Sequence, residues 1–452
     1  MNPNVVPTRR RPASILIVPF CALAAIGPSL ASAQGTAPAA PPAISAADSV
    51  WLAVSTALVL LMTPALALFY GGMVRRKNVL STMMHSFALM GTVSIIWLLL
   101  TYSLAFGKSS GFIGSLEFAL GNGISMKASY PHTAMTVPAG LFMLFQMMFA
   151  IITPALISGA IAERMKFGGY LLFTSLWAIL VYAPVACWVW NPDGWLYKKG
   201  VLDFAGGTVV HLASGVSALA ACIVLGKRKA LEQHEPVLPN NITTTLLGAG
   251  LLWFGWIGFN AGSALAMNDI AVSAFLSTHV AAAAGMLGWM LCEKLRYGRA
   301  TALGGASGLV AGLVGITPAA GFVTPLSGIL IGLIAGVLCC LAIGLKHKLK
   351  FDDALDVVGV HGVGGAAGAV LTAILADATV NSAVDASLKS NGGRGGLIMW
   401  QIIGVLTVAA FAFVATLILM KITQAIVGVR TTNDEETQGL DLTLHGEAGY
   451  NL

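Results

Sequence analysis

Apolar segments long enough to cross a lipid bilayer follow one another along most of the chain, and they constrain its fold more than any other feature. A helix needs about 20 mostly apolar residues to span the hydrocarbon core. Eleven such segments can be marked, at residues 50–72, 82–106, 136–161, 169–190, 204–226, 242–262, 270–292, 302–317, 325–345, 357–376 and 397–427. The eighth is short and rich in glycine. The sequence therefore predicts an all-α polytopic membrane protein with eleven transmembrane helices.

The composition agrees with a membrane protein and argues against other classes. Hydrophobic residues make up 57% of the chain and charged residues 10%, whereas a soluble domain is about 25% charged. The net charge of +6 comes from basic residues scattered through short loops, so we expect no nucleic-acid partner. The cysteines lie in or beside apolar segments without the spacing of a metal site. We therefore expect no metal site, no cofactor and no disulfide framework.

The N-terminus is typical of a secretory signal. Three arginines at 9–11 precede an apolar run at 15–30 and a small-residue site at 31–33. This order of regions predicts cleavage after Ala33. The alternative, an uncleaved first span, is disfavoured because two prolines interrupt a run that is shorter than about 20 residues.

Charges in the loops predict how the helices are oriented. Removal of the signal leaves the new N-terminus outside, so the loops after odd-numbered spans face the cytoplasm. Sixteen basic residues then fall inside and six outside, which is the bias of a positive-inside topology. We expect four parts, namely a cleaved signal peptide (1–33), a periplasmic linker (34–49), an eleven-helix domain (50–427) and a cytoplasmic tail (428–452).

Two histidine motifs divide the helical domain into halves. One runs from Asp203 to His211 in the fifth span, and the other runs from Asp356 to His361 in the tenth. This spacing indicates two blocks of five spans, and an odd block length inverts the second copy in the membrane. Asp203 then lies at the outer end of its span and Asp356 at the inner end of its own. The predicted fold is two inverted five-helix repeats plus one extra helix.

The histidines of these motifs are the strongest functional candidates, because ionisable groups at membrane depth are costly and mark proton or ion pathways. His211 and His361 would meet at the repeat interface, where neutral imidazoles, each with one donor and one acceptor, can pass a proton. Two imidazoles provide too few ligands for a catalytic zinc. His85 and His279 lie outside both motifs and are better explained as structural histidines with a backbone or hydroxyl partner.

A second group of residues indicates an entrance. Its members, at or near the outer ends of spans three, four and six, are Phe145, Phe149, Trp190, Phe259 and Ser263. A tryptophan face attracts a cation by about 0.5–2 kcal/mol, and a hydroxyl accepts a hydrogen bond from it. Trp190 is equally well explained as an anchor at the membrane interface, so both interpretations stay open. Asp203 is either a cation ligand or, as we favour, the N-cap of the fifth span.

Together these motifs resemble the ammonium transporter family (Amt/Mep/Rh), in its bacterial Amt branch. The matching stretches lie at 69–78, 162–164, 203–211, 255–263, 308–318, 356–362 and, in the tail, 439–447. The resemblance implies eleven spans, a homotrimer with one pore in each subunit and ammonium as the substrate. It also implies a bacterial inner-membrane location with the N-terminus outside, and a PII-family regulator at the cytoplasmic face.

The resemblance implies roles by position and a mechanism. The roles are recruitment of the cation by Trp190, Phe145 and Ser263, a gate of Phe149 and Phe259, a pore with His211 and His361, and a structural and electrostatic contribution from Asp203. An isolated ammonium ion costs tens of kcal/mol in a dry medium, whereas losing a proton at pH 7 costs about 4.6 kcal/mol for a lysine-like pKa. Capturing the ammonium cation and then passing neutral ammonia through the membrane therefore costs less free energy than passing the ion. Potassium has no proton to lose and is rejected.

Two other functions stay open beside ammonium transport. The tail beyond Val427 carries acidic residues and would let the protein act as an ammonium sensor, while a Rh-like channel for other small gases would use the same pore residues. An intramembrane enzyme is not expected. The sequence has no nucleophilic serine or cysteine at a suitable spacing, no HExxH motif and no paired intramembrane aspartates.

Overall fold

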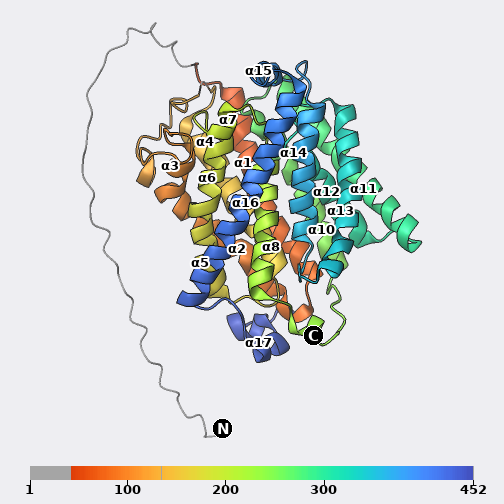
Figure 1. Cartoon of the computed structure of the whole chain (residues 1–452). Helices are drawn as coiled ribbons and strands as arrows, with labels where there is room; N and C mark the ends of the chain where they lie inside the picture. The colour runs from red at the N-terminus through yellow and green to blue at the C-terminus, as the bar shows by residue number, and fades with distance from the viewer. Residues whose placement is uncertain (1–41, 134, 451–452) are drawn as a thin grey trace. The chain divides into compact units, whose positions relative to one another are not determined.

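The structure is a computed structural model that describes residues 42–133 and 135–450 (Figure 1). All regular secondary structure within these residues is helical. Two isolated bridges, Ser109 with Gly114 and Met165 with Arg430, are the only strand-like pairings among them. The all-α prediction is confirmed, whereas the predicted signal peptide at 1–33 lies outside the described residues.

Eleven helical segments correspond one to one with the predicted spans (Figure 1). The single helices are α1 (Ala46–Met73), α4 (Ala139–Ile161), α11 (Asp269–Tyr297), α12 (Ala302–Ile316), α13 (Pro325–Leu349) and α16 (Arg394–Ile426). The second span joins η1 (Arg76–Asn78), α2 (Val79–Ile96), η2 (Trp97–Thr101) and α3 (Tyr102–Phe106), and the fourth joins α5 (Phe167–Trp177), η4 (Ala178–Tyr182) and α6 (Ala183–Trp190). The fifth joins η5 (Gly207–Leu212) and α8 (Ala213–Leu225), the sixth α10 (Ile242–Ala261) and η6 (Gly262–Ala264), and the tenth η7 (Val358–Val363) and α14 (Gly364–Leu375).

Short helices lie in the connections and the tail. They are η3 (Ala119–Gly121), α7 (Trp195–Lys198), α9 (Lys229–Glu232), α15 (Ala383–Ser390), α17 (Asn433–Gln438) and η8 (Asp441–His445). In Figure 1, α7 and α15 lie at one end of the bundle and α17 lies at the other. Short helices of the connections therefore cover one end of the membrane domain, and a helix of the tail covers the other.

The lengths of the spans agree with the sequence, with corrections at some of their ends. Ten are long and apolar enough to cross a membrane, and α12, with 15 residues, is the short one. The largest differences are that α1 begins at Ala46 and the second span at Arg76, before the predicted 50 and 82, and that α11 continues to Tyr297 and α13 to Leu349, beyond the predicted 292 and 345. At the C-terminal ends of α11 and α13 the apolar run ends at the first charged residues. The helix continues past them because lysine and arginine are good helix formers and interact favourably with a helix C-terminus.

Side-chain caps fix where several spans begin. An oxygen of Ser45, Asn241, Asn268, Thr301 and Thr324 accepts a backbone N–H three residues further on, and these bonds cap α1, α10, α11, α12 and α13. Each such cap stabilises a helix by about 1 kcal/mol. In the first turn of each of these spans, one of the free N–H groups is therefore satisfied locally.

Equivalent spans of the two halves pack against each other, as expected of the predicted inverted repeats. α1 lies along α10, where a Cβ added at Gly248 would approach the amide nitrogen of Phe69 to 2.4 Å. α8 crosses η7, where a Cβ at Gly215 would lie 2.1 Å from the nitrogen of Gly362. Because lipid gives helices no hydrophobic reason to associate, backbone contacts through glycine hold such crossings.

The tail, which contains α17 and η8, packs against the end of the bundle opposite α7 and α15 (Figure 1). No side chain next to α2 caps its first turn. Instead, the carboxylate of Asp441 accepts the N–H groups of Leu80 at 3.1 Å and Ser81 at 2.8 Å, and the N–H of Leu440 donates to Asn78 Oδ1 at 2.9 Å. The tail thus completes the second span.

A cluster of buried charges ties the loops together at this same end. Glu163 lies between Arg75, at 3.0 Å, and Arg228, at 2.8 Å. Arg228 also binds Asp352 at 2.9 Å, and Arg164 lies 3.9 Å from the same carboxyl group. Burial alone would raise the pKa of Glu163, but the guanidinium groups of Arg228 and Arg75 outweigh it and lower the pKa below its ordinary value. The ionised form is therefore the one that the fold stabilises.

We expect Glu163→Gln to lower the free energy of unfolding by about 3–5 kcal/mol, because it removes one partner of a buried ion pair. Since the pKa of Glu163 is lowered in the folded protein, its stabilising contribution is present above about pH 4.3 and is lost as the pH falls towards the folded-state value. The melting temperature of purified protein, measured by intrinsic fluorescence at pH 7 and pH 4, checks both points. Glu232→Gln, at an exposed carboxylate, is the matched control, and equal melting temperatures for the two variants would contradict the expectation.

Candidate functional site

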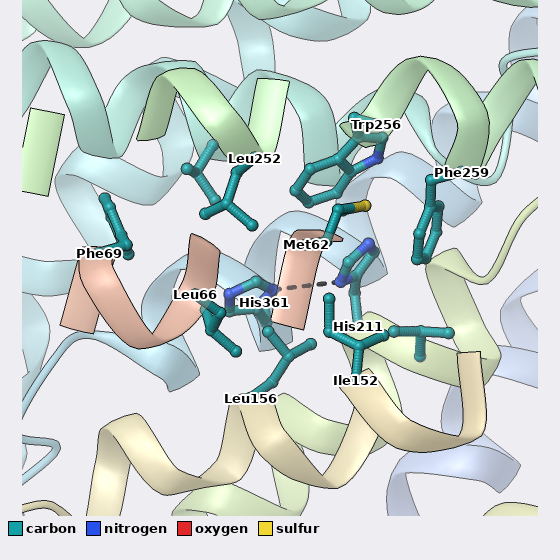
Figure 2. Close-up of a pocket in the computed structure, with 12 residues that line it drawn as sticks. Met62, Leu66, Phe69, Ile152, Leu156, His211, Leu252, Trp256, Phe259 and His361 are labelled. Atoms are coloured by element: carbon teal, nitrogen blue, oxygen red, sulfur yellow. Dashed lines mark hydrogen bonds between the residues drawn. The ribbon is translucent and has the colours of Figure 1, made fainter. Parts of the chain in front are cut away.

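A small apolar cavity lies between the two halves of the helical domain (Figure 2). Its volume is about 10 Å³, close to the least that holds one water molecule. The lining residues are Met62, Leu66, Phe69, Ile152, Leu156, Val210, His211, Leu252, Trp256, Phe259, Val310 and His361. Trp256 directs its indole N–H to Thr317 Oγ1 at 2.9 Å. The cavity is therefore apolar except for the two imidazoles.

The two motif histidines meet inside this cavity (Figure 2). Nδ1 of His361 lies 3.1 Å from Nδ1 of His211, and the ring centroids are 5.2 Å apart. One Nδ1 must carry the proton and the other must accept it. His211 also stacks on Trp256, with centroids 5.4 Å apart. Its Nε2 has no hydrogen-bond partner among the described residues, so this nitrogen is available to a molecule in the cavity.

Asp203 holds the helical segment that carries His211. Its two carboxylate oxygens accept four backbone N–H groups, those of Gly206 (2.7 Å), Gly207 (2.7 Å), Thr208 (2.8 Å) and Val209 (3.0 Å). These are the free donors at the start of η5, a π-helical segment that ends next to His211. All four bonds run from backbone N–H groups to the two oxygens of the Asp203 side chain, so the carboxylate caps the span.

The corresponding residue in the second half is Asp353, and pairing Asp203 with Asp356 was wrong. Asp353 precedes His361 by eight residues, as Asp203 precedes His211. Its carboxylate accepts the N–H groups of Val357 at 3.1 Å and Val358 at 2.7 Å, at the start of η7. Asp356 instead forms an ion pair with Lys346. The eight-residue spacing can be read from the sequence, but Asp356, which lies nearer to His361, was compared with Asp203 in its place.

A wide vestibule of about 630 Å³ lies above the cavity, among α7 and α15 and away from α17. Phe149, Trp190 and Ser263 line it, as does Asp203. The indole N–H of Trp190 donates to the backbone oxygen of Asp203 at 2.9 Å, which fixes the ring in the wall. Ser263 donates its hydroxyl to the backbone oxygen of Phe259 at 2.8 Å. The hydroxyl oxygen therefore keeps lone pairs for an incoming donor.

Two phenylalanines separate the vestibule from the cavity. The rings of Phe149, on α4, and Phe259, on α10, have centroids 4.3 Å apart. Phe149 lines the vestibule and Phe259 lines the cavity, so the pair forms the partition. Phe145 lies behind it, fully buried and 5.0 Å from Phe149, and does not line the vestibule.

Sequence reasoning missed Gln146, which lines the vestibule one residue beyond Phe145. Its Oε1 is buried and has no partner among the described residues. A carbonyl oxygen in this position is an acceptor for a donor in the vestibule. The signal was its place three residues before Phe149, which puts both side chains on one face of α4.

The other histidines lie outside this site, and one of them corrects the prediction. His85 is buried against Tyr170, with centroids 4.3 Å apart, but neither ring nitrogen has a partner among the described residues, so the expectation of a satisfied histidine was wrong. The ring of His85 is held by aromatic packing, and Phe167 continues the stack to His445 in the tail. Burial lowers the pKa of His445. His279 is exposed on α11 and stacks on Trp253, with ring centroids 5.0 Å apart.

No group of three His, Cys, Asp or Glu residues that could hold a metal occurs in the described part of the chain.

We expect Asp353→Asn to lower the free energy of unfolding by about 1–3 kcal/mol, because the amide can accept at most one of the two buried N–H groups of η7 well. The same change at Asp356 removes only a partly exposed ion pair, worth about 0–1 kcal/mol. Thermal unfolding of the two purified variants at pH 7 makes the comparison. A larger loss for Asp356→Asn would restore Asp356 as the capping residue.

Comparison with known proteins gives consistent results over nearly the whole of the described chain. The model of the Ammonium Transporter Family matches residues 50–450. An ammonium transporter of Bacillus subtilis (strain 168) is 50% identical over 404 residues, which is 89% of this chain and 98% of the relative. A putative ammonium transporter of Methanothermobacter thermautotrophicus is 47% identical, over 90% of this chain and 99% of its own.

Solved structures resemble the fold at comparable coverage. The crystal structure of Saccharomyces cerevisiae Mep2 superimposes with a TM-score of 0.80 at 39% identity, over 86% of this chain and 88% of that one. A structure titled Sensor Amt Protein superimposes with a TM-score of 0.81 at 30% identity, over 88% and 98%.

Proposed function

The chain belongs to the ammonium transporter family, and from that premise we propose that it captures the ammonium ion in the vestibule, removes its proton at the phenylalanine pair and conducts ammonia past His211 and His361. The observation that carries the proposal is the imidazole pair in an otherwise apolar cavity of about 10 Å³. A cavity this narrow has no room for a hydration shell. Its contents must be small and nearly neutral.

Capture of the cation is assigned to the wall of the vestibule. Trp190 offers an indole ring held in place by its bond to the backbone of Asp203, and such a face attracts a cation by about 0.5–2 kcal/mol. Ser263 and Gln146 add oxygen acceptors, the second of them without a partner in the described chain. Phe145 supports Phe149 from behind.

Loss of the proton is assigned to the partition formed by Phe149 and Phe259, and Nε2 of His211, whose ring stacks on Phe259 with centroids 6.0 Å apart, is the acceptor. The vestibule of about 630 Å³ can hold water, whereas the cavity below can hold scarcely one molecule. An unpaired ion entering such a place would lose tens of kcal/mol of hydration on an idealised estimate. Giving up the proton costs about 4.6 kcal/mol at pH 7 for a lysine-like pKa, so neutral ammonia passes and potassium does not.

The imidazole pair supplies the polar contacts that ammonia needs below the partition. Nε2 of His211 is unpartnered among the described residues and points into the cavity, and the Nδ1–Nδ1 bond connects it to His361. A chain of two imidazoles can also move a proton by exchanging donor and acceptor roles. We therefore include a proton relay in the proposal.

We expect His211→Ala and His361→Ala each to reduce ammonium uptake about tenfold or more, since each removes one of the two polar groups in the cavity and leaves the other unpaired. Uptake in a bacterial strain without its own ammonium transport gives the measurement. His279→Ala, outside the site, is the control. Unchanged, selective uptake in both pore variants would remove the pair from the mechanism.

The relay has its own readout in the same variants. When purified protein in vesicles on a solid-supported membrane meets a step in ammonium concentration, the wild type carries a transient current and the two alanine variants lose it. A wild type that transports ammonium without current would show that ammonia crosses alone.

The assembly and its surroundings are proposed on the family relationship. We infer a homotrimer with a pore in each subunit, in a bacterial inner membrane, with the mature N-terminus in the periplasm, the tail in the cytoplasm and the signal at 1–33 removed. The tail and its neighbouring basic loops offer a surface for a PII-family regulator. No part of the transport mechanism needs a cofactor.

A second candidate function, an ammonium sensor that signals through the tail, is favoured by one observation. The tail is tied to the membrane domain by Asp441, which caps α2, and by Leu440, so a change in the pore helices can reach it. A Rh-like channel for other small gases would use the same cavity, and competition of uptake by such gases distinguishes it.

Truncation after Val427 separates the first two functions. If the tail is part of the transporter, deletion leaves the amides of Leu80 and Ser81 uncapped, and we expect uptake to fall severalfold, with Asp441→Asn intermediate. Uptake equal to that of the full chain, with a lost transcriptional response to ammonium, would support the sensor instead. Membrane abundance, measured by immunoblotting, controls for poor expression.

A further inference from the structure

Besides the pore, the bundle has an apolar groove that opens between α8, α13, the η7–α14 segment and α16. Its volume is about 650 Å³. Its floor consists of small residues, among them Gly362, Ala366, Ala367 and Ala409, and Leu338 and Val363 at its edges are exposed. In Figure 1, α8, α14 and α16 lie next to one another on the side facing the viewer. We call this feature the α14 groove.

The α14 groove lies at the depth of the hydrocarbon core. It follows the tenth span from Val358 to Leu371, over which a helix rises about 20 Å, and the hydrocarbon core is about 30 Å thick. None of its lining residues is charged or carries a polar side chain. Water gains no hydrogen bonds in such a place, and apolar cavities of this kind stay dry.

We propose that the α14 groove binds one acyl chain of a bilayer lipid. An extended hydrocarbon chain matches a long, slim and wholly apolar space that opens sideways at membrane depth. A transmembrane helix of a second copy does not fit, because a helix is about 10 Å across with its side chains and 20 Å of it would fill about 1,600 Å³. The groove offers well under half of that volume.

The bound chain would lie directly behind the pore. Gly362 and Val363 follow His361, and Leu212 follows His211, so the wall of the groove and the wall of the cavity are made by the same two π-helical segments. The wall is thin here, because Gly215 of α8 touches the backbone of Gly362 with no side chain between. Filling the groove therefore adds contacts to η7 from outside.

The site is tested by photolabelling of the full-length protein in phosphatidylcholine vesicles, a small share of whose lipids carry a diazirine in the middle of one acyl chain. Digestion and mass spectrometry then locate the label. We expect enrichment on α14 and α16 residues of the groove, and a several-fold loss of it in Ala409→Phe, which fills the groove. Ala410→Phe is the matched control, because Ala410 is exposed on the same helix and does not line the groove.

Three outcomes would overturn the proposal. One is labelling no denser in the groove than on the outer face of α16, and another is equal labelling in Ala409→Phe and Ala410→Phe. The third is labelling that is absent in the intact oligomer and appears when it dissociates, which would show that a second copy covers the groove. Ala367→Leu, a smaller change to the floor, replaces Ala409→Phe if that variant does not fold, and none of these readouts depends on ammonium transport.

Discussion

The close approach of η5 to the η7–α14 segment, which brings Nδ1 of His361 to 3.1 Å from Nδ1 of His211, is the constraint around which the rest of the structure is arranged. It joins residues 150 positions apart that belong to opposite halves of the chain. Bringing them together requires η5 and η7 to approach almost backbone to backbone. A Cβ at Gly365 would lie 2.8 Å from the backbone oxygen of Gly207 and 3.0 Å from the Cβ of His211, so glycine is a steric requirement there.

Each of these segments starts with free N–H groups that a carboxylate eight residues before the histidine satisfies. Asp203 accepts four of them and Asp353 accepts two. At the edge of the hydrocarbon an unsatisfied N–H costs several kcal/mol. The two caps therefore do more than begin a helix, because they fix how far each histidine lies from the end of its span. The inverted repeat places one cap at each end of the bundle.

The charges are distributed so that the central cavity contains none. At one end of the bundle Glu163, Arg228 and Asp352 pair with one another, and at the other end Lys198 lines the vestibule and is exposed. The change from about 630 Å³ to about 10 Å³ across Phe149 and Phe259 is then also a change from a place that tolerates a cation to one that does not. In the mechanism that we propose, selectivity for a cation that can lose a proton follows from this change.

Features of the fold and the site could be predicted where a run of apolar residues or a repeated motif marks them in the sequence. The eleven spans follow from runs of apolar residues, and the meeting of His211 with His361 follows from the repeat of a motif. Asp353 could have been found because it precedes His361 by eight residues, as Asp203 precedes His211, but Asp356 lies nearer to the histidine and was aligned with Asp203 instead. The position of Phe145 behind the partition, the unpaired ring of His85 and the capping of α2 by Asp441 depend on tertiary contacts that no pattern in the sequence specifies.

The end of the bundle with the tail differs from the vestibule end in how its helices are held. Most spans begin with their own caps, but α2 takes its cap from Asp441, more than 350 residues away. Asn78 sits at the junction, donating to Glu163 at 2.9 Å and accepting from Leu440 at 2.9 Å. Displacement of the tail would leave the amides of Leu80 and Ser81 and the side-chain oxygen of Asn78 without these partners, while Asn78 Nδ2 could still donate to Glu163. The loops at this end are therefore linked to the tail through Asn78 and Asp441, whereas the cap at Asp203 lies at the vestibule and is made within its own segment.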